Sequence, residues 1–315
     1  MPEIPAESAH RPVLLAASLR LLAPENGGLF VDATLGLGGH TEGILNASPD
    51  ATVIGIDQDT EAMSLARTRL SRFGKRVTFA HANFSTIREV VGNAMPSGII
   101  ADLGVSSLQL DSPMRGFSFR FDAPLDMRMD TDSSDMTAAE LLAILDEKEI
   151  ADIIYRYGEE RASRKIARWI VEKREAGTPI ETTVELAELV RRAVRTKPKD
   201  KIHPATRTFQ ALRIAVNHEL EILEQFVNDS VDLLKNNGVL AIITFHSLED
   251  RIVKQTFQRL SGRCFCPPRI PQCVCGAVKR VEILTRKPVI AADDEIFENP
   301  RSRSANLRAC RKLEQ

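Results

Sequence analysis

One stretch of the sequence decides the fold: LFVDATLGLGGH, residues 29–40. Its first half, Leu29–Thr34, is a short apolar run, and its second half is a turn rich in glycine. Glycine lets a backbone turn tightly and approach a ligand closely. The next apolar run, Thr52–Asp57, ends in an acid that is placed to accept hydrogen bonds from both hydroxyls of a ribose. Together these features predict a site for a nucleoside cofactor.

Dinucleotides and S-adenosylmethionine are both bound by sites of this kind. The turn departs from the G-x-G-x-x-G pattern of NAD sites, because Thr41 occupies the third glycine position. This departure argues against an NAD-dependent oxidoreductase, which stays open as a rival. The other alternative is an ordinary turn between a strand and a helix, in which Asp57 caps the helix.

Further apolar runs follow with helical segments between them. They are Val77–Ala82, Ser97–Leu103 and, much later in the chain, Val239–Phe245. Continuous runs of this kind separated by helices indicate a parallel sheet covered on both faces. We therefore expect an α/β, doubly wound domain made of residues 1–112 and 217–315, with a helical domain inserted at 113–216.

The expected insertion carries clear helix signals. Capping boxes begin helices at Thr137 and at Thr182. A long helical stretch, with a possible break, runs from His203 to Lys235, and Gly238 is expected to end it in the left-handed conformation. Two short strands are expected near Val281–Thr285 and Ala305–Lys312.

The charges nearly cancel, with 42 basic and 43 acidic residues, so any nucleic-acid contact must come from local patches. No apolar run approaches the length of a membrane span, and no secretory signal is visible. We expect a cytoplasmic protein without a membrane partner.

The fourth and fifth strands end in polar residues on the edge of the sheet where ligands collect. Asp102 is placed to orient an amino group by accepting its N–H hydrogen bonds, or to contact the cofactor alone. His246 follows the fifth strand as a candidate proton acceptor, with a structural hydrogen-bonding role as the alternative. We take Asp102 and His246 as the candidate catalytic residues.

Eight segments in order along the chain carry a resemblance to a known family. They are GGH (38–40), DLGVSS (102–107), RGFSF (115–119), PLDMRM (124–129), YGEER (157–161), HPATRTFQALRI (203–214), FHSLEDRIVK (245–254) and NPRSRSANLR (299–308). With these motifs the chain resembles the bacterial 16S ribosomal RNA (cytosine-N4) methyltransferase family over nearly its whole length.

The resemblance implies a class I S-adenosylmethionine-dependent methyltransferase (Rossmann-like) sheet with an inserted helical domain for substrate recognition. The implied reaction is N4-methylation of a cytidine in the decoding centre of 16S ribosomal RNA in the small subunit, by a monomer or homodimer. The implied cofactor contacts are Gly38, Gly39, His40, Asp57, Phe84, Asp102 and Gln109. Leu108 departs from the family, which usually has proline there, and the Asp/Asn-Pro-Pro-aromatic motif of many amino methyltransferases is absent.

RNA contacts are expected from three basic segments: residues 161–168, residues 191–207 and the C-terminal residues 301–312. Solvated helix faces are the alternative for each segment. Phe117 and Phe119, flanked by arginines, suit stacking on an unpaired base, with buried packing as the alternative. The candidate substrate-binding residues are Arg115, Phe117, Phe119, Asp126, Arg128, His203 and Arg207.

Four cysteines form a C-x-C-x₆-C-x-C pattern at 264, 266, 273 and 275. Four thiolates suit a structural zinc ion, but the spacing within each pair is tighter than the usual C-x₂-C, and the surrounding prolines suggest a surface loop. No metal site is assigned from the sequence. A ribosome-assembly factor that keeps the cofactor fold without catalysis is the second rival function.

Overall fold

A computed structural model describes residues 12–133, 135–194, 203–266 and 274–314. The chain forms two compact units, the first from 1–104 and 220–315 and the second from 105–219. The sequence placed these boundaries at 112/113 and 216/217. The difference has a physical reason, because Val105 and Leu110 pack against the core of the second unit. At the other boundary, an ion pair of 2.7 Å ties Glu219 to Arg213.

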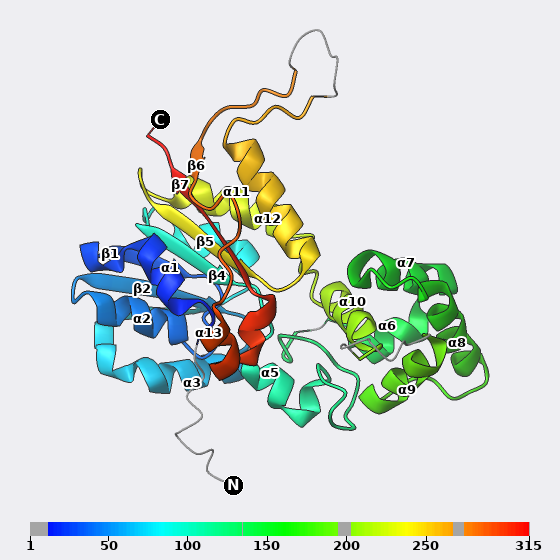
Figure 1. Cartoon of the computed structure of the whole chain (residues 1–315). Coiled ribbons are helices and arrows are strands. Elements are labelled where there is room, and N and C mark those ends of the chain that lie inside the picture. The colour runs from blue at the N-terminus through cyan, green and yellow to red at the C-terminus, as the bar shows by residue number, and fades with distance from the viewer. Residues whose placement is uncertain (1–11, 134, 195–202, 267–273, 315) are drawn as a thin grey trace. The chain divides into compact units, whose positions relative to one another are not determined.

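The first unit contains a seven-stranded sheet with the order β3-β2-β1-β4-β5-β7-β6 (Figure 1). Its strands are β1 (Gly28–Asp32), β2 (Ala51–Asp57), β3 (Val77–His81), β4 (Gly98–Asp102), β5 (Val239–Thr244), β6 (Val281–Ile283) and β7 (Asn306–Lys312). Strands β1 to β5 are parallel, as the sequence predicted. β7 pairs antiparallel with β5 and β6, an orientation that the sequence did not predict.

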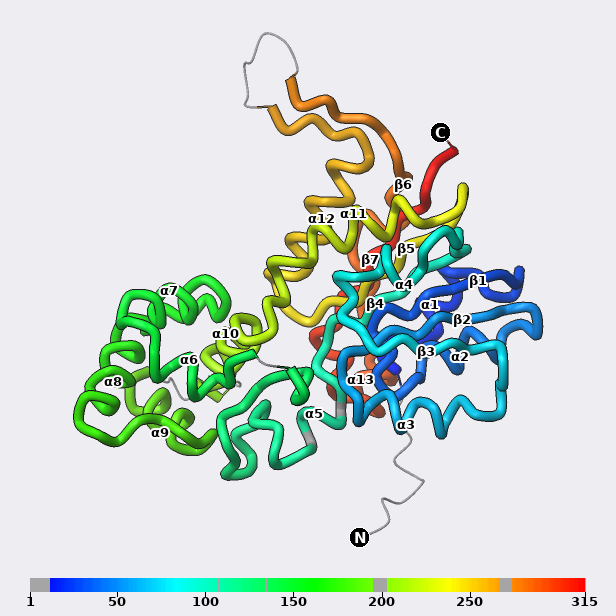
Figure 2. Tube along the Cα trace, turned by 180° about the vertical axis from the view of Figure 1, so that it is seen from behind, coloured from blue at the N-terminus to red at the C-terminus, as the bar shows by residue number. Residues whose placement is uncertain are grey.

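The sheet is covered on both faces because consecutive side chains of a strand point to opposite sides. In β1, Phe30 joins the core under α1, α2 and α3, whereas Val31 joins the core under α4, α11 and α12. Figure 2 shows the molecule from behind, with α4 and α11 in front of the sheet. The bounds are α1 (Leu15–Leu22), α2 (Gly39–Ala47), α3 (Thr60–Leu70), α4 (Ile87–Val91), α11 (Leu223–Leu233), α12 (Ser247–Leu260) and α13 (Asp293–Glu298).

The second unit is helical. Its helices are α5 (Ser107–Asp111), α6 (Ala138–Ile144), α7 (Glu147–Gly158), α8 (Ser163–Glu175), α9 (Thr183–Ala193) and α10 (Thr206–Val216). Both predicted capping boxes are present, at Thr137 with Glu140 and at Thr182 with Glu185. The predicted long helical stretch is broken between α10 and α11, where the chain passes from one unit to the other.

The predicted end of that stretch is wrong in one detail. Helix α11 ends at Leu233, and the residue with positive φ is Asn237 (φ 65°), not Gly238. Asparagine is the residue that most readily replaces glycine in this conformation. No helix in the described part of the chain is both long and apolar enough to cross a bilayer.

Candidate active site

Three acids end three neighbouring strands of the first unit. Asp32 ends β1, Asp57 ends β2 and Asp102 ends β4. β1 lies between β2 and β4 and runs parallel to both, so the three carboxyl ends lie at one edge of the sheet. In open α/β sheets this is the edge where ligands bind.

The glycine turn is fastened to the end of β2. The backbone N–H of Gly36 donates to Oδ2 of Asp57 at 2.6 Å, and the N–H of Leu35 donates to the carbonyl of Ile56 at 2.8 Å. Asp57 Oδ1 accepts the N–H of Asp59 at 2.9 Å. Each carboxylate oxygen has two lone pairs, so both oxygens keep capacity to accept a ribose hydroxyl.

Gly38 shows why this turn needs glycine. Its φ is +78°, and an added Cβ would lie 2.8 Å from Cδ1 of Leu70 in α3. Gly38 also N-caps α2, whose first residues are Gly39 and His40. The turn therefore brings the start of α2 close against α3, and a side chain at position 38 would push the two apart.

Asp32 is a member of this cluster that the sequence analysis did not single out. Its side chain is 1% exposed. Its Oδ2 accepts the hydroxyl of Thr41 at 2.7 Å, and its Oδ1 accepts the N–H of Thr34 at 3.4 Å. Asp32 thus holds both flanks of the glycine turn. The available signal was an acid at the last position of a strand, directly before that turn.

Burial raises the pKa of Asp32, Asp57 and Asp102, each to about 6 from an ordinary value near 3.8. The charge of Asp32 also raises the pKa of the other two. Three carboxylates without a cation among their described hydrogen-bond partners favour a positively charged ligand at this edge.

Asp102 and His40 interact electrostatically within this edge. Burial lowers the pKa of His40, and the charge of Asp102 opposes that change. His40 Nε2 lies 3.0 Å from the carbonyl of Val13. The backbone N–H of Asp102 donates to the hydroxyl of Thr34 at 2.6 Å, which ties β4 to the glycine turn.

Phe84 lies at the start of the turn after β3 and is half-buried. Its ring packs edge-on against Phe226 of α11, with the ring centroids 4.9 Å apart. The predicted packing against a base therefore involves a ring that already belongs to the hydrophobic core on this face of the sheet.

His246 is the N-cap of α12. Its Nδ1 accepts the backbone N–H of Glu249 at 3.4 Å, and its Nε2 lies 2.9 Å from Oε1 of Glu249. Glu249 Oε2 in turn accepts the N–H of Phe245 at 2.8 Å. This geometry supports the structural alternative for His246, because its ring serves the start of a helix.

Gln109 belongs to the second unit, unlike the other six predicted cofactor contacts. It completes a capping box at the start of α5. Ser106 Oγ accepts the N–H of Gln109 at 3.1 Å, and Gln109 Oε1 accepts the N–H of Ser106 at 3.0 Å. Its side chain is 5% exposed.

Phe117 and Phe119 of the second unit differ in how deeply they are buried. Phe117 is only 7% exposed and lies in the core, which is the packing alternative for that residue. Phe119 is half-buried, with His203 at a ring-centroid distance of 4.6 Å and Phe209 at 5.0 Å. Base stacking thus remains a proposal for Phe119 alone.

Arg115, Asp126 and Arg128 brace the loop that leads to α6. Arg115 is 8% exposed, and its guanidinium donates to the carbonyls of Arg128 and Met129 at 3.3 and 2.8 Å. Asp126 and Arg128 form a two-bond ion pair of 2.8 and 2.9 Å. Hydrogen bonds from Arg128 lower the pKa of Asp126 against its partial burial.

His203 and Arg207 are exposed at the start of α10. His203 Nδ1 accepts the N–H of Ala205 at 3.2 Å, and Arg207 Nη1 lies 4.0 Å from the buried carboxylate of Glu160. The exposed cations of α8, Arg164, Lys165 and Arg168, form the second basic set of this unit. Residues 195–202 of the predicted basic segment 191–207 lie outside the described part of the chain.

The C-terminal basic segment is mostly engaged within the first unit. Arg308 is 6% exposed and binds Asp250 through two hydrogen bonds of 2.6 and 2.9 Å. Arg311 pairs with Glu282 at 3.3 Å, and Lys312 donates to two backbone carbonyls. The expectation of an RNA-binding patch is therefore wrong for Arg308, because β7 is an internal strand of the sheet.

The topology and the acidic edge define a class I S-adenosylmethionine-dependent methyltransferase. The chain belongs to the MraW methylase family, whose pattern matches residues 7–313. It is 50% identical to the ribosomal RNA small subunit methyltransferase H of Geotalea daltonii, over 98% of this chain and all of that protein. The proteins of the same name from Geobacter sulfurreducens and Carboxydothermus hydrogenoformans are 51% and 48% identical, over 97% and 98% of this chain and 99% of each relative.

Proposed function

We propose that the protein transfers a methyl group from S-adenosylmethionine to the N4 atom of a cytidine in the decoding centre of 16S ribosomal RNA. One observation carries the reaction class: the carboxyls of Asp32, Asp57 and Asp102, whose pKa values are all raised by burial, lie with the glycine turn at the carboxyl edge of the sheet. The names and identity of the relatives support the choice of ribosomal RNA.

The residues at this edge fit the cofactor. S-adenosylmethionine carries a positive sulfonium and an ammonium group, and it supplies an electrophilic methyl group when bound. Asp57 keeps lone pairs for the ribose hydroxyls, while Gly38, Gly39 and His40 form the backbone that approaches the cofactor. Phe84 is proposed beside the adenine, and Gln109 stays a proposed cofactor contact.

Asp102 is the proposed catalytic residue. A cytosine amino group is a poor nucleophile because its lone pair is delocalised into the ring. A carboxylate that accepts its N–H hydrogen bonds favours a more tetrahedral nitrogen and stabilises the positive charge that grows there. In the transfer, the N4–methyl bond forms, the sulfur–methyl bond breaks, and N4 then releases one proton. A carboxyl with a pKa of about 6 is suited to accept that proton near neutral pH.

Substrate recognition is proposed for the second unit. Phe119, His203 and Arg207 are its candidate RNA contacts, because the ring of Phe119 is not fully covered and the other two are exposed. Arg115, Asp126 and Arg128 act as positioning residues, since their side chains bind the loop itself. We propose that the reaction occurs in the cytoplasm and that the enzyme acts as a monomer or homodimer.

The test is transfer of labelled methyl to small ribosomal subunits that lack their decoding-centre methylation. The RNA is then digested and its nucleosides identified by mass spectrometry. N4-methylated cytidine that is lost with Asp102→Ala, while cofactor binding persists, is the expected result. Label on a ring carbon or a ribose would overturn the choice of acceptor. Tight cofactor binding and subunit binding without any label would favour the assembly-factor rival.

A further inference from the structure

The connection between α12 and β6 forms a loop with a closed stem. Ser261 and Lys279 form an antiparallel bridge, and the N–H of Arg280 donates to the carbonyl of Leu260 at 2.7 Å. Beyond this stem, the apolar side chains Val274 and Val278 are 75% and 64% exposed. The described part of the loop therefore has no apolar core of its own, and a segment without a core needs another source of order.

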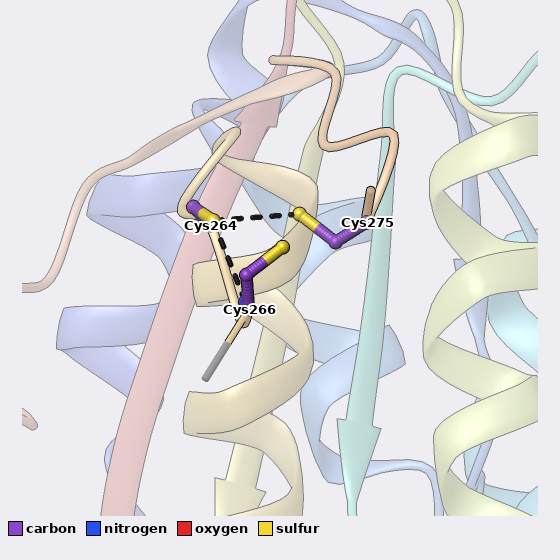
Figure 3. Close-up of side chains that lie close together, drawn as sticks. All are labelled: Cys264, Cys266 and Cys275. Carbon is purple, nitrogen blue, oxygen red and sulfur yellow. Dashed lines mark hydrogen bonds between the residues drawn. The ribbon is translucent and has the colours of Figure 1, made fainter. Parts of the chain in front are cut away.

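Three cysteines converge in this loop. The sulfur atoms of Cys264, Cys266 and Cys275 all lie within 4.8 Å of one another (Figure 3). The sulfurs of Cys264 and Cys275 are 3.6 Å apart. A tetrahedral zinc site with Zn–S bonds of about 2.3 Å requires sulfurs roughly 3.8 Å apart. The pair thus lies close to the spacing of two ligands of one ion.

Backbone N–H groups point at two of the three sulfurs. The N–H of Cys266 points to Sγ of Cys264 at 3.4 Å, and the N–H of Val274 points to Sγ of Cys266 at 3.3 Å. Such N–H donors stabilise thiolates and orient metal ligands. Gly276, with φ +58°, turns the chain directly after Cys275.

We propose that Cys264, Cys266 and Cys275 bind a structural zinc ion that orders the loop between α12 and β6. Thiolate ligands select zinc among the available divalent ions, and tetrahedral zinc takes four ligands, of which the described residues supply three. Each coordinating thiol loses its proton on binding, so metal uptake releases protons. Zinc then holds together two chain segments that the stem alone joins at one end.

The test is the zinc content of the whole protein, purified without chelators and measured by plasma mass spectrometry. One zinc per chain is expected. The double variant Cys264→Ser/Cys275→Ser is expected to contain almost none. Cys310→Ala is the matched control, because Cys310 is fully buried in β7 and is expected to leave the zinc content unchanged. Zinc retained by the double variant, or absent from the native chain, overturns the proposal.

Two further measurements separate a lost site from a damaged fold. The native protein, stripped by a chelator, is expected to take up zinc again with release of protons. Cys266→Ser is expected to weaken zinc binding at least about ten-fold in a chelator competition, since even substitutions around metal ligands have effects of that size. Thiol titration without reductant tests whether Cys264 and Cys275 form a disulfide instead. A disulfide between Cys264 and Cys275 in a protein without zinc would overturn the site.

Discussion

The backbone N–H of Gly36 donates to Oδ2 of Asp57 at 2.6 Å, across 21 positions of the sequence. This bond joins the glycine turn to the acid at the end of the neighbouring strand. The carboxylate that we assign to the ribose is therefore also the group that holds the turn in place. Binding of the cofactor and the shape of its loop depend on the same side chain.

Asp57→Asn is expected to weaken cofactor binding. An asparagine presents one accepting oxygen and one NH₂ donor, so either Gly36 N–H or Asp59 N–H faces another donor. We expect the Kd for S-adenosylmethionine to rise about 10- to 100-fold, in line with the strength of hydrogen bonds to charged groups. Calorimetric titration measures the change. Asp50→Asn, an exposed acid before β2, is the control, and an equal effect there would contradict the assignment.

The pH dependence of stability follows from the three raised pKa values. Asp32, Asp57 and Asp102 bind protons more tightly in the folded chain than in the unfolded chain. The folded state therefore holds more protons between about pH 4 and about pH 6, and the free energy of unfolding falls as pH rises through that window. Urea unfolding across this range checks the sign, and a stability that rises over the same window would contradict it.

Cofactor binding is expected to change with pH in the opposite direction. As Asp32 and Asp57 ionise near pH 6, they attract the positive sulfonium more strongly. The Kd for S-adenosylmethionine should therefore fall as pH rises. S-adenosylhomocysteine has a neutral sulfur and is the matched ligand, with a smaller expected change. Parallel curves for both ligands, measured by calorimetry, would show that the acids do not sense the sulfonium.

Asp102→Asn distinguishes catalysis from cofactor contact. The variant keeps the size of the side chain and the backbone bond to Thr34. If Asp102 stabilises charge on N4, kcat should fall about 100- to 1,000-fold with little change in cofactor Kd. Single-turnover methyl transfer and cofactor titration provide the two numbers. An unchanged kcat together with a raised Kd would assign Asp102 to the cofactor alone.

Gly38→Ala is expected to destabilise the first unit through two separate effects. The positive φ costs about 1–2 kcal/mol for a residue with a Cβ, and the contact with Leu70 at 2.8 Å adds about 1–3 kcal/mol of overpacking. Gly177→Ala isolates the first effect, because φ is +79° there, close to that of Gly38, and no atom lies within 4 Å of the added Cβ. Urea unfolding of both variants measures the difference, and equal losses would exclude the close contact.

Arg207→Ala is expected to weaken binding to ribosomal RNA without loss of stability. The residue is exposed, and its nearest acid, Glu160, lies 4.0 Å away. Loss of one phosphate contact should lower the slope of log K against log salt by about 0.7–0.9. Lys75→Ala, an exposed lysine of the first unit, is the control. A binding curve with an unchanged salt slope would remove Arg207 from the interface.

The sequence predicted the local features well because their causes are local. The capping boxes at Thr137 and Thr182 depend on residues three positions apart, and both are present. The five parallel strands follow from continuous apolar runs. Asp57 was predicted at the end of β2 because it ends an apolar run 21 positions after Gly36 of the glycine turn.

The remaining features depend on partners that are distant in sequence. Phe117 and Phe119 are two positions apart, yet only packing against the rest of the unit buries the first more than the second. The sequence suggested that Arg308 binds phosphate. In the structure β7 is an internal strand of the sheet, and Arg308 binds Asp250 instead. The role of Asp32 was not predicted, because it depends on a hydrogen bond from Thr41, which lies nine positions away beyond the glycine turn.

The interrupted sheet has a consequence for the order of events during synthesis. β4 pairs with β5, but β5 begins at Val239, after the whole of residues 105–219 has been made. Because synthesis starts at the N-terminus, one edge of β4 is unpaired until β5 has been made. During that time the helical unit, which is continuous in sequence, can fold through its own local contacts. Closure of the nascent sheet must wait for the last third of the chain, and an exposed strand edge during that delay is the point where a chaperone would be most needed.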